Sequence, residues 1–162
     1  MITPDYCRTM ARYNAWQNDS IRTTVAAMPD EELRRDRGAF FGSILGTLNH
    51  LLWADRRILA RLQGASLPGG SPEGSADLTP NGAEWSTARF RADGRIRLWA
   101  DSLTALDLTG TVTWGPGGTY PRALIVTHLF NHQTHHRGQV HAMLTAAGHA
   151  TTATDLPLMP EK

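Results

Sequence analysis

The stretch LIVTHLFNHQTHHRGQVHAML, residues 124–144, holds four of the chain's seven histidines within nine consecutive positions. At about 100° per residue, apolar residues such as Ile125 and Met143 fall on one stripe of a helix. His136 falls inside this stripe, and His132 lies at its edge. The stretch therefore predicts an amphipathic helix that carries imidazoles along its buried side.

The spacing of His132 and His136 points to a metal ion. Residues four apart on a helix have Cβ atoms about 5–6 Å apart, so their imidazoles can bind one ion, as in other His-x-x-x-His sites. Buried imidazoles without partners cost free energy, and a metal ion satisfies one nitrogen of each. A third ligand must come from elsewhere, and His50 is the only histidine outside the last third of the chain.

Other assignments of the histidines stay open at this point. The Leu and Ile stripe of the helix that carries His50 centres about 140° away from it, so His50 is not on the main apolar face. His128, His132 and His135 share one face and form a rival ligand set. Each histidine could also be exposed or hydrogen-bonded without any metal.

Apolar periodicity predicts four helices, at residues 3–28, 43–62, 83–106 and 121–148. Thr3 and Pro4 suit the start of the first helix, because threonine caps helices and proline is tolerated in the first turn. Gly64 ends the second helix and Gly148 ends the fourth.

The segments between the helices complete the predicted fold. Residues 64–81 are rich in Gly, Pro and Ser and form a long loop. Residues 111–118 combine strand propensity with turn residues, which predicts a short hairpin or an ordered loop before the last helix. The expected fold is all-α, a four-helix bundle that forms a single domain over residues 1–162.

Composition excludes several classes of protein. The chain has 162 residues, a formal net charge of +1 and a single cysteine. A protein built to bind nucleic acid would show a clustered basic excess, so we expect no nucleic-acid partner. No apolar stretch is long enough to span a bilayer, and the N-terminus lacks the apolar core of a secretory signal. We therefore expect a cytoplasmic protein without a membrane partner.

Three patches carry a family resemblance: YNAWQN at residues 13–18, LNHLLWADRRILARL at 48–62, and NHQTHHRGQVHAML at 131–144. In this order they resemble the DinB/YfiT-like family of metal-dependent enzymes, and the likeness covers nearly the whole chain. The resemblance implies a four-helix bundle, often a homodimer. One histidine of the second helix and two of the fourth would bind a divalent metal.

Carried over to this sequence, those ligands are His50, His132 and His136. Zn or Ni is the expected ion, with Fe as a further option, since all three suit imidazole. The implied enzyme acts on a small molecule through a metal-activated water or thiolate, as a hydrolase or as a transferase of a low-molecular-weight thiol. Thiol transfer would need a pocket that reaches from the metal to an anionic cofactor, lined by Arg57 or Arg61. The alternative is a non-catalytic stress-response bundle that binds a metal or ligand.

Four further residues have a predicted role. Asp55 lies in the middle of an apolar stripe, which favours a structural ion pair with an arginine of another helix over a role as a base. Gln139 lies close to the direction of His132 and could bind substrate or orient a ligand. Arg137 is expected to hold a helix or dimer contact, and Gly138 to allow another helix to approach closely.

Overall fold

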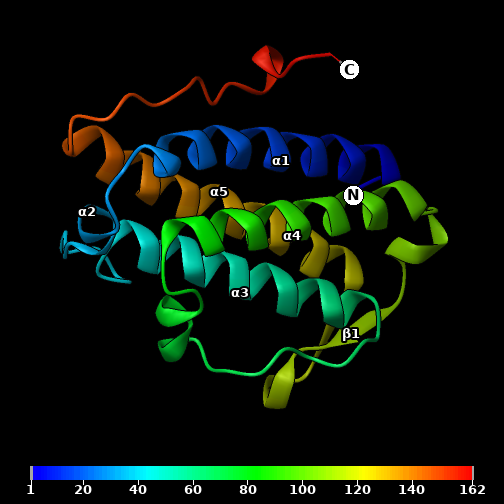
Figure 1. Cartoon of the computed structure of the whole chain (residues 1–162). Coiled ribbons are helices and arrows are strands. Elements are labelled where there is room, and N and C mark those ends of the chain that lie inside the picture. The colour runs from blue at the N-terminus through cyan, green and yellow to red at the C-terminus, as the bar shows by residue number, and fades with distance from the viewer. Residues whose placement is uncertain (1, 162) are drawn as a thin grey trace.

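The computed structural model describes residues 2–161. Four long helices dominate this range, as Figure 1 shows: α1 (Pro4–Ala26), α3 (Ile44–Leu62), α4 (Gly82–Ser102) and α5 (Arg122–Ala146). The shorter elements are α2 (Asp30–Arg34), the strands β1 (Thr111–Thr113) and β2 (Thr119–Pro121), and 3₁₀ turns at Glu73–Asp77, Leu106–Leu108, Gly115–Gly117 and Leu156–Leu158. The predicted all-α four-helix bundle is confirmed.

Side-chain caps fix where α1 and α3 begin. Thr3 Oγ1 accepts a hydrogen bond from the Tyr6 amide at 3.1 Å, and Ser43 Oγ accepts one from the Gly46 amide at 3.0 Å. Such bonds satisfy amides that have no partner within the helix. The helix expected at residues 83–106 instead ends at Ser102, because Leu103 adopts an extended conformation.

The segment before the last helix is a hairpin rather than a loop. β1 and β2 pair antiparallel, with Val112 opposite Tyr120, and the Trp114 amide donates to the Gly118 carbonyl at 2.8 Å. Val112 is buried in the core, so the hairpin closes one end of the bundle.

The apolar core forms two clusters separated by polar residues. α1 packs mainly against α4, and α3 against α5. One cluster, at the hairpin end, includes Cys7, Ile58, Trp99 and Phe130. The other, toward α2, includes Ile21, Leu45, Trp85 and Val140. Buried polar side chains lie between the two clusters along each of the four long helices: Asn14, Gln17, Asn18, Asp55, Asp93, Gln133, His136 and Arg137. The buried Arg89 of α4 lies within the second cluster, between Trp85 and Ala92.

The long loop after α3 folds back along that helix, as Figure 1 shows. Asn49 donates to the Ala76 carbonyl at 2.8 Å, and Trp53 Nε1 donates to the Gly69 carbonyl at 3.0 Å. These bonds fix the loop over a second face of α3. As a result, most residues of α3 are buried, including those outside its apolar stripe.

The C-terminal segment lies along α1 and returns toward the end of the bundle where the chain begins (Figure 1). Tyr13 Oη donates to the Thr154 carbonyl at 2.6 Å, and Gln17 Nε2 donates to the Ala153 carbonyl at 3.0 Å.

None of the helices within residues 2–161 combines the length and the hydrophobicity needed to cross a bilayer.

Candidate metal centre

Three histidines from two helices meet between α3 and α5. His50 comes from α3, and His132 and His136 from successive turns of α5. One ring nitrogen of each lies within 4.8 Å of the others. His132 Nε2 is 3.4 Å from His50 Nε2 and 3.0 Å from His136 Nε2. The structure thus brings together the three residues that the family resemblance selected.

The opposite nitrogens of two of these rings have defined partners. His136 Nδ1 is 2.7 Å from Gln139 Oε1, a carbonyl oxygen that can only accept, so this nitrogen carries the proton. His50 Nδ1 is 2.9 Å from Ser75 Oγ, and Ser75 donates its own proton to the Pro72 carbonyl. Ser75 therefore accepts from His50. Both histidines carry the proton on Nδ1, which leaves a lone pair on each Nε2.

These lone pairs make the site suitable for a cation. Nε2 atoms that face one another at hydrogen-bond distance without protons repel each other, and a single proton on His132 could serve only one neighbour. Bonds of about 2.0–2.1 Å to one ion, at angles of about 90–110°, place nitrogen ligands about 2.9–3.4 Å apart. The two separations measured from His132 fall in this range. The residues therefore fit a divalent ion of the kind that prefers imidazole.

Burial keeps the imidazoles neutral. The pKa of His50 is lowered to about 4, mainly by burial and to a smaller extent by the neighbouring His136. Burial and the surrounding histidines lower the pKa of His132 to about 3. Burial also lowers the pKa of His136, against the opposing effect of its hydrogen bond to Gln139. At neutral pH all three rings are in the form that binds a metal.

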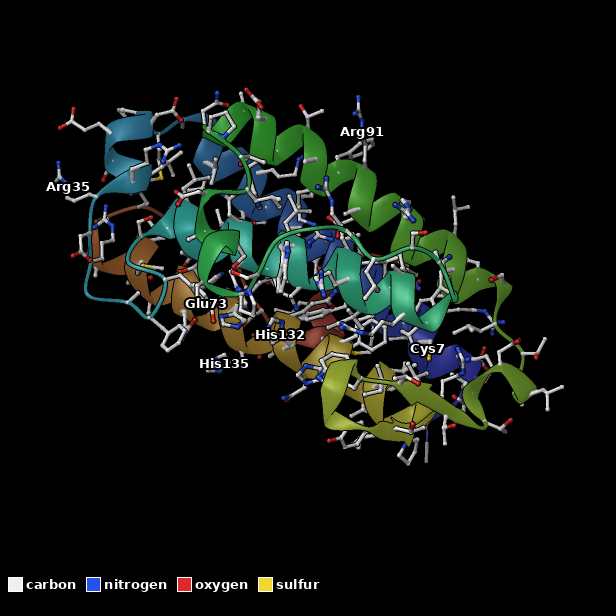
Figure 2. All side chains as sticks on the ribbon, turned by 90° about the horizontal axis from the view of Figure 1, so that it is seen from below. Cys7, Arg35, Glu73, Arg91, His132 and His135 are labelled. Carbon is white, nitrogen blue, oxygen red and sulfur yellow. The ribbon has the colours of Figure 1, made fainter. Side chains whose placement is uncertain are left out.

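Access to the cluster is limited to one side. His50 and His136 are each only 7% exposed, whereas His132 is partly exposed. The Phe41 ring stacks on His50 with a centroid distance of 3.8 Å and so fixes that imidazole. In Figure 2, His132 lies at the junction of α3 and α5. A small molecule would reach the cluster from this side.

The rival set of His128, His132 and His135 does not form. Among residues 2–161, the group of possible metal ligands holds neither His128 nor His135. His135 is exposed at the outer edge of α5 (Figure 2). The His128 ring instead meets Trp114 edge-on, with a centroid distance of 5.4 Å. The rotation of α5 in the bundle therefore selects His136 over His135.

Asp55 and Arg137 act within the bundle. Asp55 Oδ2 accepts from Arg89 of α4 at 2.6 Å, and both side chains are 1% exposed, which matches the predicted ion pair. Arg137 is buried, donates to Asn14 Oδ1 and lies over the Tyr13 ring, so it holds α5 against α1.

Gly138 gives a different outcome. Apart from the neighbouring backbone of α5 itself, a Cβ added there would meet no atom of residues 2–161 within 4 Å. The predicted close approach of another helix at this glycine is wrong, because position 138 lies on the exposed side of α5.

Two residues at the cluster escaped sequence reasoning. Ser75 sits in the loop that covers α3, and Phe41 precedes that helix. Each reaches His50 only through the fold of a connecting segment, and the periodicity of a helix carries no signal for such contacts. The pattern of polar residues did give a signal for Gln139, which was predicted to orient a ligand or bind substrate.

Comparisons with known proteins agree with the fold. The model of the DinB family matches residues 1–162. Protein DinB of Bacillus subtilis (strain 168) is 24% identical over 165 residues, which cover 95% of this chain and 93% of that protein. A DinB-like protein from Bacillus cereus ATCC 10987 superposes with a TM-score of 0.64 at 21% identity, covering 85% of this chain and 90% of the other.

A second solved structure has a higher TM-score. YfiT from Bacillus subtilis superposes with a TM-score of 0.70 at 12% identity, covering 93% of this chain and 92% of YfiT. YfiT is described as a probable metal-dependent hydrolase with an unusual four-helix bundle topology. At these identities the two structures establish a shared fold.

Proposed function

Because this chain belongs to the DinB family, we propose that His50, His132 and His136 hold a divalent metal ion in a metal-dependent enzyme that acts on a small molecule. The observation that carries the proposal is the convergence of three Nε2 atoms, two of them freed by protons held on Nδ1. When bound, such an ion lowers the pKa of a water or thiol and supplies a nucleophile at neutral pH.

The chain's own residues prepare the site in three ways. Ser75 and Gln139 hold the protons of His50 and His136 away from the shared centre. The Phe41 ring limits rotation of the His50 ring. The partly exposed side of His132 admits a small molecule. Three protein ligands leave coordination positions for a nucleophile, which favours a reactive site over a closed structural one.

We propose hydrolysis as the reaction and Zn or Ni as the ion, with Fe as the third option. The description of YfiT as a probable metal-dependent hydrolase supports this choice. The homodimer, the cytoplasmic location, the single domain, the lack of a nucleic-acid partner and the stress-response role stay predictions.

Metal analysis of untagged protein tests the ligand set. We expect about one divalent ion per chain in the wild type, as for a single three-histidine site, and loss of the ion in His136→Ala. His135→Ala is the matched control, because it removes the neighbouring imidazole that points outward. A wild type that takes up no Zn, Ni or Fe would overturn the proposal, and loss of metal only in His135→Ala would favour the rival set.

An activity screen tests the reaction. Metal-loaded protein is offered nitrophenyl esters with and without added small thiols, and His136→Ala serves as the blank. Ester cleavage that needs metal but no thiol supports hydrolysis, and turnover only with a thiol supports the transferase. A protein that binds metal and turns over nothing in either format would favour the non-catalytic bundle.

A further inference from the structure

A cavity lies beside the candidate metal centre, at the hairpin end of the bundle. It has a volume of about 290 Å³ and is lined by Trp114 and Tyr120 of the hairpin segment and by Leu124, Ile125 and His128 of α5. Leu124 is 49% exposed and Tyr120 is 37% exposed, so both side chains offer apolar surface to a ligand. We refer to this cavity as the hairpin pocket.

His128 joins the hairpin pocket to the histidine cluster. Its ring meets the Trp114 ring on one side and the His132 ring on the other, with centroid distances of 5.4 Å in both cases. His132 is also the partly exposed member of the cluster, whereas His50 and His136 are buried. A molecule bound in the hairpin pocket could therefore contact His128, and only the His128 side chain would separate it from His132.

A positive charge stands at the wall of the pocket. The Arg61 guanidinium lies 4.7 Å from the centroid of the Trp114 ring, in a cation–π arrangement. Among residues 2–161, Arg61 takes part in none of the ion pairs. Arg57, one turn earlier on α3, adds a second positive charge on the same face and stacks on Trp53.

The lining residues include no carboxylate, so the local field favours a negative ligand. Arg61 would supply charge-assisted hydrogen bonds to it. The aromatic and aliphatic walls in turn favour a ligand with an apolar body.

We propose that the hairpin pocket binds a small amphipathic anion, with its aromatic or aliphatic body against Trp114 and Leu124 and its carboxylate or similar group at Arg61. Resting on the proposed function, we further assign this pocket as the part of the enzyme that selects its substrate. The substrate class is then an apolar organic acid or its derivative, with the reacting group toward His132.

Two fluorescent probes with related aromatic bodies test the pocket. 1-Anilinonaphthalene-8-sulfonate carries an anionic group, and N-phenyl-1-naphthylamine lacks it. We expect Arg61→Gln to weaken binding of the sulfonate about tenfold, as loss of one charge-assisted bond would, and to leave the neutral probe unchanged. Arg35→Gln, at an exposed arginine that follows α2 at the opposite end of the bundle, is the matched control and should change neither.

The apolar walls are tested in the same titrations. Leu124→Ser should weaken both probes and leave the protein folded, because the Leu124 side chain is half-exposed. Circular dichroism checks the fold of each variant. Equal losses of both probes in Arg61→Gln would overturn the role of Arg61. Unchanged binding in Leu124→Ser would place the probes elsewhere and overturn the pocket.

The titrations are run on metal-free and metal-loaded protein, so that a failure of the proposed metal centre can be distinguished from a failure of the hairpin pocket. Probe binding without any uptake of metal would retain the pocket and reject the metal centre. If ester cleavage is found, Arg61→Gln should raise KM for an ester that carries a carboxylate and leave kcat unchanged. A fall in kcat alone would overturn the assignment to substrate selection.

Discussion

Ser75 and Gln139 determine which nitrogen of two imidazoles carries the proton. Neither residue belongs to the group of possible metal ligands. Ser75 contacts Nδ1 of His50, and Gln139 contacts Nδ1 of His136, the nitrogens that face away from the shared centre. Such outer contacts orient a ligand and raise its basicity, and their loss weakens metal binding. The affinity of the proposed centre should therefore depend on a hydroxyl and an amide that never touch the ion.

This dependence gives a prediction for two variants. We expect Ser75→Ala and Gln139→Leu each to weaken Zn binding by about 10- to 100-fold, because the freed Nδ1 proton can move to Nε2. Competition with a chromogenic chelator measures the affinity. Ser71→Ala is the control on the same loop, since the partners of its hydroxyl are the Gly74 amide and the Glu73 carboxylate rather than a histidine. Affinities equal to that of the wild type would contradict the role of the two residues.

At the scale of single residues, the sequence predicted the α5 pair better than the α3 ligand. The helical wheel placed His136 inside the apolar stripe that α5 buries and His132 at its edge, although it left His128, His132 and His135 as a rival set. His50 lies off the apolar stripe of its own helix. It is buried because residues 64–81 cover that face, and a wheel contains no information on a covering loop. His50 was a candidate because it is the only histidine outside the last third of the chain, and the family resemblance then selected it against the indication of the wheel.

At the scale of elements, one buried arginine is the centre of a network of ion pairs and hydrogen bonds that connects the long helices. Arg89 of α4 contacts Asp55 of α3 at 2.6 Å and Asp93 of its own helix at 2.7 Å. Asp93 accepts from Asn18 of α1, and Gln133 of α5 donates to Asp55. The network therefore links all four long helices between the two apolar clusters.

Removal of Arg89 should destabilise the whole bundle. Arg89→Leu leaves two carboxylates buried without their cation, and we expect a loss of about 3–5 kcal/mol in the free energy of unfolding. Urea denaturation measures it. Arg97→Gln on the exposed side of the same helix should change this value by less than about 0.5 kcal/mol. A loss below about 1 kcal/mol in Arg89→Leu would show that the network contributes little.

Helix boundaries were predicted to within a few residues where a cap was visible. Thr3 caps α1 as its position in the sequence suggested, and Ser43, the first residue of the second predicted helix, caps α3. The end of the third predicted helix was placed too late, because Leu106 continues the apolar spacing although the backbone has already left the helix at Leu103. Periodicity indicates which side chains are buried, but it gives no information on whether the backbone that connects them is still helical.

At the scale of the whole molecule, the buried histidines couple stability to pH. The pKa of His50 falls to about 4 and that of His132 to about 3, against about 6.5 in an unfolded chain. Between these values and 6.5 the unfolded state binds more protons than the folded state. The stabilisation is therefore complete above about pH 6.5 and is lost as the pH falls toward the folded-state values.

Metal-free protein should show this loss directly. We expect the free energy of unfolding to decrease between about pH 6.5 and pH 5, by about 1.4 kcal/mol per pH unit for each extra proton bound on unfolding. Urea denaturation in the presence of a chelator measures the slope. His132→Gln should flatten the slope, whereas Asn131→Gln, at an exposed neighbouring position, should retain it. A stability that does not change over this range would contradict the burial of neutral imidazoles.

The attachment of the C-terminal segment to α1 affects how the chain can vary. Tyr13, Gln17 and Arg12 all bind main-chain carbonyls of the segment, those of Thr154, Ala153 and Pro160. Every amino acid offers the same carbonyl, so replacement of a residue preserves these bonds. Removal of one residue shifts the later carbonyls by about 3.3 Å along an extended chain. The segment is thus tolerant of changes in side chain and intolerant of insertions and deletions.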